Sequence, residues 1–309
     1  MKMTSHLTLA MMLSALLACG TTDTESSADS ATDSTAQSEE QNTTDTTDDT
    51  TSTNDSTDST DSSTPNPDEE ANEGDSDAPS MAAELASQFE GTFALHRSVT
   101  TSQEIPMMGA SEIVTTSLGY AQVTFDGEDL WFTEHGCHVE SGGDSPVEVD
   151  IPDVIARSIQ PAPVKLKVWQ EGDTVYWHRP ETVTLLGVTL DDPKADALPD
   201  DPSDPRVFDQ DSDGNPGVTV KLVGFISGDL YVVQRTINTY RGTLADSGVL
   251  TGSIEEYGEQ SIMGSTNSML EQDIPTEALN DPETNVIKMV AVDSAIDCDA
   301  VVELADSLF

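Results

Sequence analysis

Apolar and polar residues alternate along most of the chain beyond residue 90. In the segment 91–102, Phe93, Leu95 and Val99 share one parity, and the segment 164–170 repeats this spacing. Successive side chains of a β-strand point to opposite faces, so a period of two indicates half-buried strands. The pattern predicts strands near 91–102, 112–125, 130–139, 164–170, 174–179, 182–190, 217–226, 230–243, 249–262 and 286–292.

Short turn signals separate these segments, among them Asp126-Gly127 and Ser227-Gly228-Asp229. Strands joined by such turns form antiparallel hairpins. Helical patterns are few and cover only 81–88, 152–159 and 299–308, with Asp297 or Asp299 near the start of the last. Because strands and helices do not alternate regularly, we expect an all-β fold with a few short helices. It would be an antiparallel β-barrel, of which a lipocalin-like barrel is one form, or a β-sandwich.

The segment 21–80 differs from the rest in composition. It contains no Lys, Arg, aromatic residue, Leu, Ile or Val, and consists largely of Ser, Thr, Asp and Glu. Such a segment cannot bury enough apolar surface to offset the entropy lost on ordering, so it predicts a disordered linker. We therefore expect a signal peptide over 1–18, a lipidated cysteine with an acidic linker over 19–80, and a single β-domain over 81–309.

The first residues carry the features of an export signal. Lys2 precedes an apolar run from about Leu7 to Leu17, which is too short to span a bilayer as a helix. The ending Leu16-Leu17-Ala18-Cys19 resembles the lipobox of bacterial lipoproteins, although Leu17 stands where a smaller residue is usual. The resemblance implies cleavage before Cys19, acylation of Cys19 and anchoring in the lipid bilayer. Gly20, in place of Asp, favours the outer membrane by resemblance to Gram-negative lipoproteins.

Acidic residues dominate the charge of the expected domain. Residues 81–309 hold 40 of the 58 acidic residues and 11 of the 12 basic ones, giving a formal charge of about −29. This excess opposes binding to nucleic acid or to anionic lipid head groups. It is compatible with cationic or basic partners, and equally with a solvated acidic surface.

Two cysteines remain once Cys19 is assigned to lipid. Cys137 and Cys298 would lie in an oxidising compartment, where two thiols most often pair, so we expect a disulfide between them. The neighbouring His135 and His138 allow a metal site in principle. However, alternate strand residues face opposite sides, and no second ligand pair follows.

The sequence Asp209-Gln210-Asp211-Ser212-Asp213-Gly214-Asn215 spaces three aspartates by two and follows them with glycine. It resembles the calcium loops of EF-hands and thrombospondin type-3 repeats, in which alternate carboxylates converge on a cation. The resemblance implies a structural calcium ion held by Asp209, Asp211, Asp213 and Asn215. The twelfth position is Val220 instead of the bidentate Glu, and an acidic turn without an ion is the alternative.

No catalytic motif is visible in the sequence. There is no Gly-x-Ser-x-Gly, no His-Glu-x-x-His and no phosphate-binding glycine loop, and His96, His135, His138 and His178 all lie in predicted strands. We therefore expect a non-enzymatic lipoprotein of the cell envelope that binds a small apolar ligand or a protein partner. An exported hydrolase whose site forms only in three dimensions and a purely structural envelope protein are the alternatives.

Overall fold

The structure is a computed structural model that describes residues 81–105, 109–143, 147–224, 227–271 and 276–309. The predicted signal peptide, the lipidation site Cys19 and the predicted linker lie outside these residues. Among the residues described, no helix has both the length and the apolar character needed to cross a membrane.

The described chain folds into eleven β-strands, three short α-helices and one 3-10 turn. The strands are β1 (Gly91–Ile105), β2 (Gly109–Phe125), β3 (Leu130–Gly143), β4 (Val147–Asp150), β5 (Val164–Glu171), β6 (Thr174–Leu186), β7 (Val218–Gly224), β8 (Gly228–Leu244), β9 (Leu250–Ser265), β10 (Thr276–Ala278) and β11 (Val286–Val292). The helices are α1 (Met81–Ser87), α2 (Asp153–Ser158) and α3 (Cys298–Leu308), and the 3-10 turn is η1 (Ser268–Leu270).

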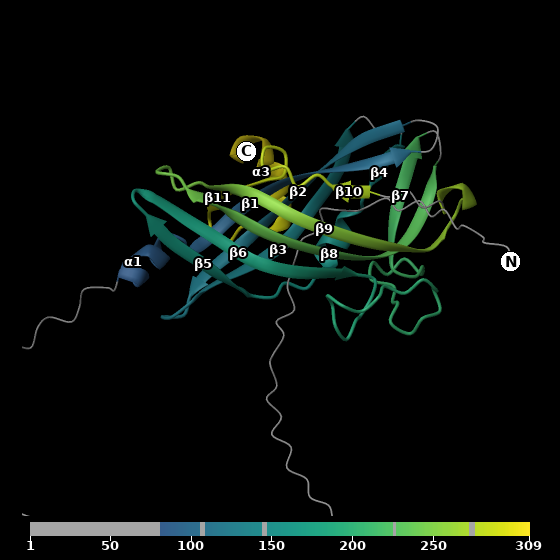
Figure 1. Cartoon of the computed structure of the whole chain (residues 1–309), viewed down its shortest axis with the longest axis horizontal. Helices are drawn as coiled ribbons and strands as arrows, with labels where there is room; N and C mark the ends of the chain where they lie inside the picture. The colour runs from purple at the N-terminus through teal and green to yellow at the C-terminus, as the bar shows by residue number, and fades with distance from the viewer. Residues whose placement is uncertain (1–80, 106–108, 144–146, 225–226, 272–275) are drawn as a thin grey trace, which may run out of the picture. The chain divides into compact units, whose positions relative to one another are not determined.

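Eight strands pair in sequence order and return to the first one (Figure 1). The order is β1-β2-β3-β5-β6-β8-β9-β11, and β11 pairs with β1 to close the ring. Every one of these pairings is antiparallel. Closure pairs both edges of each of these strands over at least part of its length, and so reduces the free backbone groups presented to other chains.

Three shorter strands modify this ring. β4 and β7 pair with each other and connect β3 to β8 at the end of the sheet where β3 and β5 have separated. β10 pairs only with the far part of β1, where Gln103 lies opposite Thr276 and Thr101 opposite Ala278. The sheet is therefore wider at the end near β4, β7 and β10 than at the end near α1 (Figure 1).

The structure confirms the predicted antiparallel all-β fold with few helices. Two predicted strands, 174–179 and 182–190, form the single strand β6, which continues through an irregularity between Arg179 and Thr182. Pro180 lies within that irregularity, where a residue without an N–H interrupts the ladder. The predicted α3 begins as expected, because the Asp297 side chain accepts a hydrogen bond from the Ala300 N–H at 2.9 Å.

Two apolar clusters occupy the interior. One lies toward α1 and is built around Phe89, Phe132 and Trp177, while the other lies toward β4 and β7 and includes Ile155 of α2. Each fully buried large side chain contributes roughly 1.5–3 kcal/mol relative to an exposed one. These clusters stabilise the two ends of the ring, and residues of a different kind fill its middle.

Polar side chains fill the space between the clusters. Along β8, the inward positions change from Val232 to polar residues and back to Tyr240, and the inward face of β6 repeats this order. Members of the layer come from six strands and are all buried: Arg97, Glu134, Arg179, Thr182, Thr184, Gln234, Thr236, Asn238 and Glu256, with Thr115 and Ser117. A filled polar layer of this kind is unusual in a small β-domain and locates the candidate site.

Candidate functional site

Two buried arginines and one tyrosine form the centre of the polar layer. An Arg97 guanidinium nitrogen donates to the Tyr240 hydroxyl, and the Arg179 guanidinium lies 3.6 Å from the centre of the Tyr240 ring. Arg97 Nε also lies 3.6 Å from Glu134 Oε1. Burial raises the pKa of Tyr240 to about 12, so its hydroxyl remains a neutral donor and acceptor at physiological pH.

An asparagine connects this centre to a second buried carboxyl group. Asn238 Oδ1 accepts a hydrogen bond from Arg179, and Asn238 Nδ2 donates to Glu256 Oε2 at 3.3 Å. Arg179 also donates to the Thr182 hydroxyl, next to the irregularity in β6. Side chains from β6, β8 and β9 thus form one continuous hydrogen-bonded path that ends at Glu256.

Glu256 differs from the other members of the path because one of its oxygens is not used. Its side chain is only 4% exposed, and Oε1 has no hydrogen-bond partner among the described residues. Burial raises the pKa of Glu256 to about 8, even though Arg97 and Arg179 favour the ionised form. A carboxyl group buried without full hydrogen bonding is costly, which makes it informative about function.

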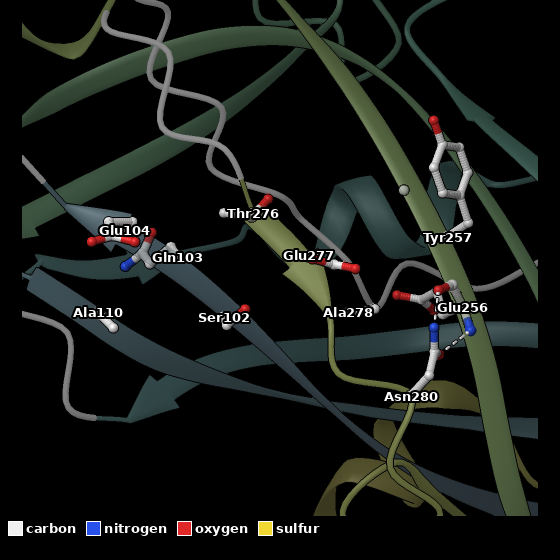
Figure 2. Close-up of a pocket in the computed structure, with 11 residues that line it drawn as sticks. Ser102, Gln103, Glu104, Ala110, Glu256, Tyr257, Thr276, Glu277, Ala278 and Asn280 are labelled. Carbon is white, nitrogen blue, oxygen red and sulfur yellow. Dashed lines mark hydrogen bonds between the residues drawn. The ribbon is translucent and has the colours of Figure 1, made fainter.

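Glu256 lines a cavity of about 550 Å³ between β9 and the edge formed by β1 and β10 (Figure 2). In Figure 2 its carboxyl group points from β9 toward β10, whereas the exposed ring of Tyr257 points away on the other side of the strand. The described residues that line the cavity are Ser102, Gln103, Glu104, Ala110, Glu256, Tyr257, Gly258, Thr276, Glu277, Ala278 and Asn280.

The cavity exists because two neighbouring strands separate. β11 fills the space between β1 and β9 only as far as the pairing of Val286 with Ser253. Beyond this pairing, hydrogen bonds from asparagine side-chain amides take the place of a paired strand. Asn280, at a φ of 52°, accepts from the Glu256 N–H at 2.7 Å and donates to the Glu256 carbonyl at 3.0 Å. Asn285 connects β1 and β9, because its side chain accepts from the Thr100 N–H and its carbonyl accepts from the Ile254 N–H, both at 2.9 Å.

The cavity lining is acidic and offers further unsatisfied acceptors. Glu104 and Glu277 are exposed at its rim, and none of the described lining residues is Lys, Arg or His. The Thr276 hydroxyl is buried and, like Glu256 Oε1, has no hydrogen-bond partner among the described residues. The arrangement is suited to hydrogen-bond donors that carry positive charge.

The predicted aspartate loop lies in the long connection between β6 and β7. One carboxylate oxygen each from Asp209, Asp211 and Asp213 lies within 4.8 Å of the others, so these three residues could hold a metal ion. Two oxygens bound to one calcium ion at about 2.4 Å cannot be farther apart than about 4.8 Å, so the spacing fits a shared ion. Sequence reasoning correctly brought these three side chains together.

Hydrogen bonds within the loop set these carboxylates in place. Asp209 accepts from the Asp213 and Gly214 N–H groups, and Asp213 accepts from the Asn215 N–H at 2.8 Å. Asp211 Oδ2 accepts from the Thr219 N–H at 2.8 Å, while its buried Oδ1 has no partner among the described residues. Burial, strengthened by the nearby charge of Asp213, raises the pKa of Asp211.

Asn215, the fourth predicted ligand, uses its side-chain amide to donate to Asp213 at 3.0 Å. In the proposed calcium loop, its contribution would therefore come from the backbone carbonyl, as the seventh position does in the loops it resembles. The flanking element is strand β7, as the sequence predicted, and Val220 at the twelfth position is buried in the core.

The remainder of the β6–β7 connection is held by other contacts. Leu190 and Leu198 pack against Val233 and Met263 of the sheet. Arg235 donates to the carbonyl oxygens of Pro193 and Asp196 from beneath the segment. An ion at the aspartate loop would therefore stabilise one end of a segment that is already anchored elsewhere.

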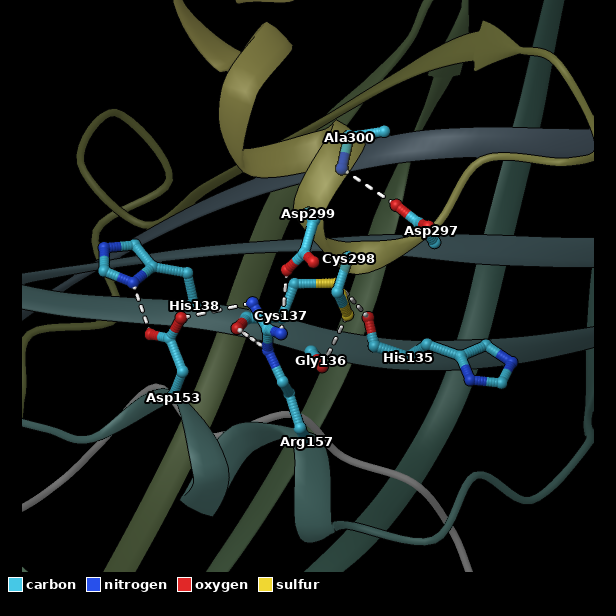
Figure 3. Close-up of a disulfide and its surroundings, with 10 residues drawn as sticks. All are labelled: His135, Gly136, Cys137, His138, Asp153, Arg157, Asp297, Cys298, Asp299 and Ala300. Atoms are coloured by element: carbon cyan, nitrogen blue, oxygen red, sulfur yellow. Dashed lines mark hydrogen bonds and ion pairs between the residues drawn. A yellow bond between two sulfur atoms is a disulfide. The ribbon is translucent and has the colours of Figure 1, made fainter.

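The structure contains the predicted disulfide between Cys137 and Cys298, which links residues 161 apart in sequence (Figure 3). Cys137 is the extra residue of a bulge in β3, because Leu118 pairs with His138 and Gly119 with Gly136. The bulge resets the alternation, so that His135 and His138 are both half-buried instead of facing opposite sides. The strict alternation expected for this strand was therefore wrong at this point.

Arg157 of α2 joins the elements around the disulfide. It donates to the Cys137 carbonyl at 3.2 Å and to Asp299 of α3 at 2.9 Å, and it pairs with Asp153 at 3.2 Å (Figure 3). His138 Nδ1 lies 2.7 Å from the same aspartate. These contacts connect α2, β3 and α3 through Arg157 and pair His138 with Asp153.

The other two histidines lie away from the cavity. His96 stacks against Phe309, with 5.2 Å between the ring centres, and burial together with Lys288 lowers its pKa. Burial and the charges of Arg241 and Lys167 lower the pKa of His178. Neither residue lines the cavity beside Glu256.

Sequence reasoning missed Arg97, Arg179, Tyr240 and Glu256. The available signal was their parity. Arg97 occupies the same face of its strand as Leu95 and Val99, and Glu256 follows Ile254 by two residues. A charged residue at a core position of an alternating strand indicates a buried polar partner elsewhere in the chain.

Comparisons of this chain with protein-family models, with curated protein sequences and with solved structures found no match.

Proposed function

We propose that this chain is a membrane-anchored binding protein of the bacterial cell envelope, whose β-domain holds a small polar ligand in the cavity beside Glu256. The observation that carries the proposal is the unused Glu256 Oε1, which is buried at the cavity wall. Leaving a buried acceptor without a donor typically costs about 1–3 kcal/mol, and a ligand donor would remove that cost. The cavity volume also lies in the range of small-molecule sites.

The lining residues favour a polar ligand over the apolar one considered from the sequence. Gln103, Glu256 and Thr276 form the buried part of the wall, and the apolar members are small or lie at the surface.

A thermal-shift screen tests the binding proposal. Neutral, anionic and cationic metabolites would be added to the chain from residue 19 onward, with Cys19→Ser to keep it free of lipid. Ala278→Trp fills the cavity from β10 and should abolish any stabilisation, whereas Ala245→Trp in the exposed turn after β8 should leave it unchanged. Equal stabilisation of both variants by every active compound would contradict binding in this cavity.

The proposed location follows from the lipobox ending in Cys19 and the acidic segment behind it. Two or three acyl chains give stable anchoring where one does not. A tether of about sixty residues would average roughly 40–45 Å as a flexible coil and more when its charges repel. We expect labelled palmitate to be incorporated into the wild-type chain and not into Cys19→Ser. Incorporation into Cys19→Ser would remove the anchor assignment.

We also propose that Asp209, Asp211 and Asp213 hold a calcium ion that stabilises the end of the β6–β7 connection. The supporting observation is the convergence of three carboxylates whose spacing fits one ion, with Asp211 Oδ1 left unpartnered. Without a bidentate Glu, carbonyl oxygens and water would complete the coordination, so binding should be in the weak range typical of extracellular modules.

A further inference from the structure

Three carboxyl groups converge on the cavity, and they differ in depth. Glu256 lies at the buried wall, whereas Glu104 and Glu277 are exposed at the rim. No described lining residue offers a positive charge to balance them. An anion would be repelled here, and a neutral ligand would leave the rim carboxylates unused. A ligand with more than one positive charge could pair with the buried carboxyl group and with the exposed ones.

The buried wall specifies the kind of cation. Glu256 Oε1 and the Thr276 hydroxyl have no hydrogen-bond partner among the described residues, and both residues are more than nine-tenths buried. An ammonium group carries three donors on a narrow stem and can therefore approach a buried acceptor such as Glu256 Oε1. Its aliphatic chain would lie along the small lining residues Ala278 and Gly258. A bare metal ion would find only one carboxyl group at this depth.

The charged groups behind Glu256 determine whether a cation can bind there without the release of a proton. Arg97 from β1 and Arg179 from β6 face Glu256 from within, with Glu134 of β3 and the neutral Tyr240 of β8 beside them. With Glu256 protonated, these groups carry a net charge of +1. Adding an ammonium ion would raise this charge to +2 unless a proton leaves. Exchange of the proton for the ammonium keeps the charge of the buried layer constant.

We propose that the cavity binds a short aliphatic polyamine, with one terminal ammonium on Glu256 and its other positive charges along the part of the cavity lined by Thr276, Glu104 and Glu277. This inference rests on the proposed binding function of the cavity. The exchange is balanced: the Glu256 O–H bond breaks, its proton passes to solvent, and the carboxylate forms an ion pair with the incoming ammonium. One proton leaves for each ligand bound.

The exchange predicts how affinity depends on pH. The pKa of Glu256 is about 8 and that of an aliphatic ammonium about 10, so the ligand stays charged while the site deprotonates. Apparent affinity should rise about tenfold per pH unit below pH 8 and level off above it. The rim carboxylates add a salt-dependent attraction for the ligand.

Titration calorimetry with spermidine and 1,4-diaminobutane, and with 1,4-butanediol as the neutral control, tests this assignment. Measurements at pH 7 in buffers of different ionisation enthalpy count the protons released. We expect about one proton per diamine at pH 7 and none at pH 9.5. Glu256→Gln should bind at least tenfold more weakly and release no proton. Thr276→Val should weaken binding a few-fold and keep the proton release.

Matched controls separate a site effect from a folding effect. Glu255→Gln alters the neighbouring exposed carboxylate, which pairs with Arg241 on the outer face, and should leave spermidine binding unchanged. Far-ultraviolet circular dichroism and an intact Cys137–Cys298 disulfide would establish that Glu256→Gln is folded.

Two outcomes would overturn the ligand class while leaving the binding function in place. One is binding of 1,4-butanediol that Ala278→Trp abolishes, with no binding of either amine. The other is binding of a lysine-rich peptide, with the same proton release, by a chain that ignores free amines. By contrast, amine binding that neither Glu256→Gln nor Ala278→Trp affects would place the ligand outside the cavity and remove both proposals.

Discussion

The molecule holds two groups of carboxylates whose environments are built in opposite ways. Glu256 lies in the interior, and its surroundings come from Arg97, Arg179 and Asn238 on three other strands. The aspartates of residues 209–213 lie on an exposed connection, and most of their hydrogen bonds come from within the same eleven residues. The first environment depends on the closure of the whole sheet, and the second depends mainly on local chain geometry.

The difference shows that a site is easier to predict from sequence when its residues lie close together along the chain. Asp209, Asp211 and Asp213 can be recognised by their spacing, because the short segment that contains them also determines how they are arranged. Glu256 acquires its properties from partners up to 159 residues away, and no short motif records that arrangement. The two sites should therefore respond differently when the fold or the solvent is changed.

The largest expected effect comes from breaking the interior network. Arg179→Met keeps most of the side-chain volume but removes the charge that contacts Tyr240, Asn238 and Thr182. Removing one partner of a buried charged group typically costs about 3–5 kcal/mol of unfolding free energy. Urea unfolding would measure the loss. Arg241→Met, which removes an exposed pair with Glu255, should cost less than about 1 kcal/mol. Similar losses for both variants would show that the network contributes nothing special.

The second effect is the dependence of stability on pH, which should differ between Glu256 and the aspartates of the loop. Glu256 keeps its proton to about pH 8 when folded, against an ordinary pKa of 4.5. The folded chain therefore binds more protons than the unfolded chain between these values, and stability falls as pH rises through this window. At about 1.4 kcal/mol per pKa unit, the loss across this window is roughly 4–5 kcal/mol. Glu256→Gln should remove this part of the slope and be more stable than the wild type at pH 8.5. Parallel pH profiles of the two proteins would contradict the buried position of the carboxyl group.

The smallest effect belongs to the exposed loop. With a dissociation constant of about 0.1–1 mM, 10 mM calcium would add roughly 1.4–2.7 kcal/mol of stability. Thermal melting with calcium and with chelator should differ by several degrees, and Asp211→Asn should remove the difference. Asp246→Asn, in the exposed turn between β8 and β9, serves as the control and should keep it. No calcium dependence in the wild type would leave the loop as an acidic turn without an ion.

Much of the fold could be predicted from the sequence because alternation reports directly on which strand face is buried. The predicted segments at 91–102 and 230–243 fall within β1 and β8, and the segment at 249–262 starts one residue before β9. β4 and β10 were missed because four and three residues are too few to show a period. The bulge at Cys137 was missed because an extra residue leaves no sign in the sequence until the partner strand is known.

The candidate site was predicted only in part. The disulfide and the clustering of the aspartates could be foreseen, because two cysteines leave one pairing and the loop is local. The cavity could not, because it depends on where β11 ends and on how Asn280 and Asn285 bind β9 and β1 beyond that point. Arg97 at an inward position was the available clue, but its partner Tyr240 lies 143 residues away.

The pairing of β1 with β11 has a consequence for the order in which the molecule can be completed. β1 emerges first during synthesis, and its second neighbour is among the last segments made. Until residues 286–292 arrive, one side of β1 is an unpaired edge, and Cys137 has no partner. Contacts that join distant parts of a chain also slow folding. The segment from residue 286 onward thus completes the sheet late, and a chain truncated before residue 286 would expose an unpaired edge of β1 to other chains.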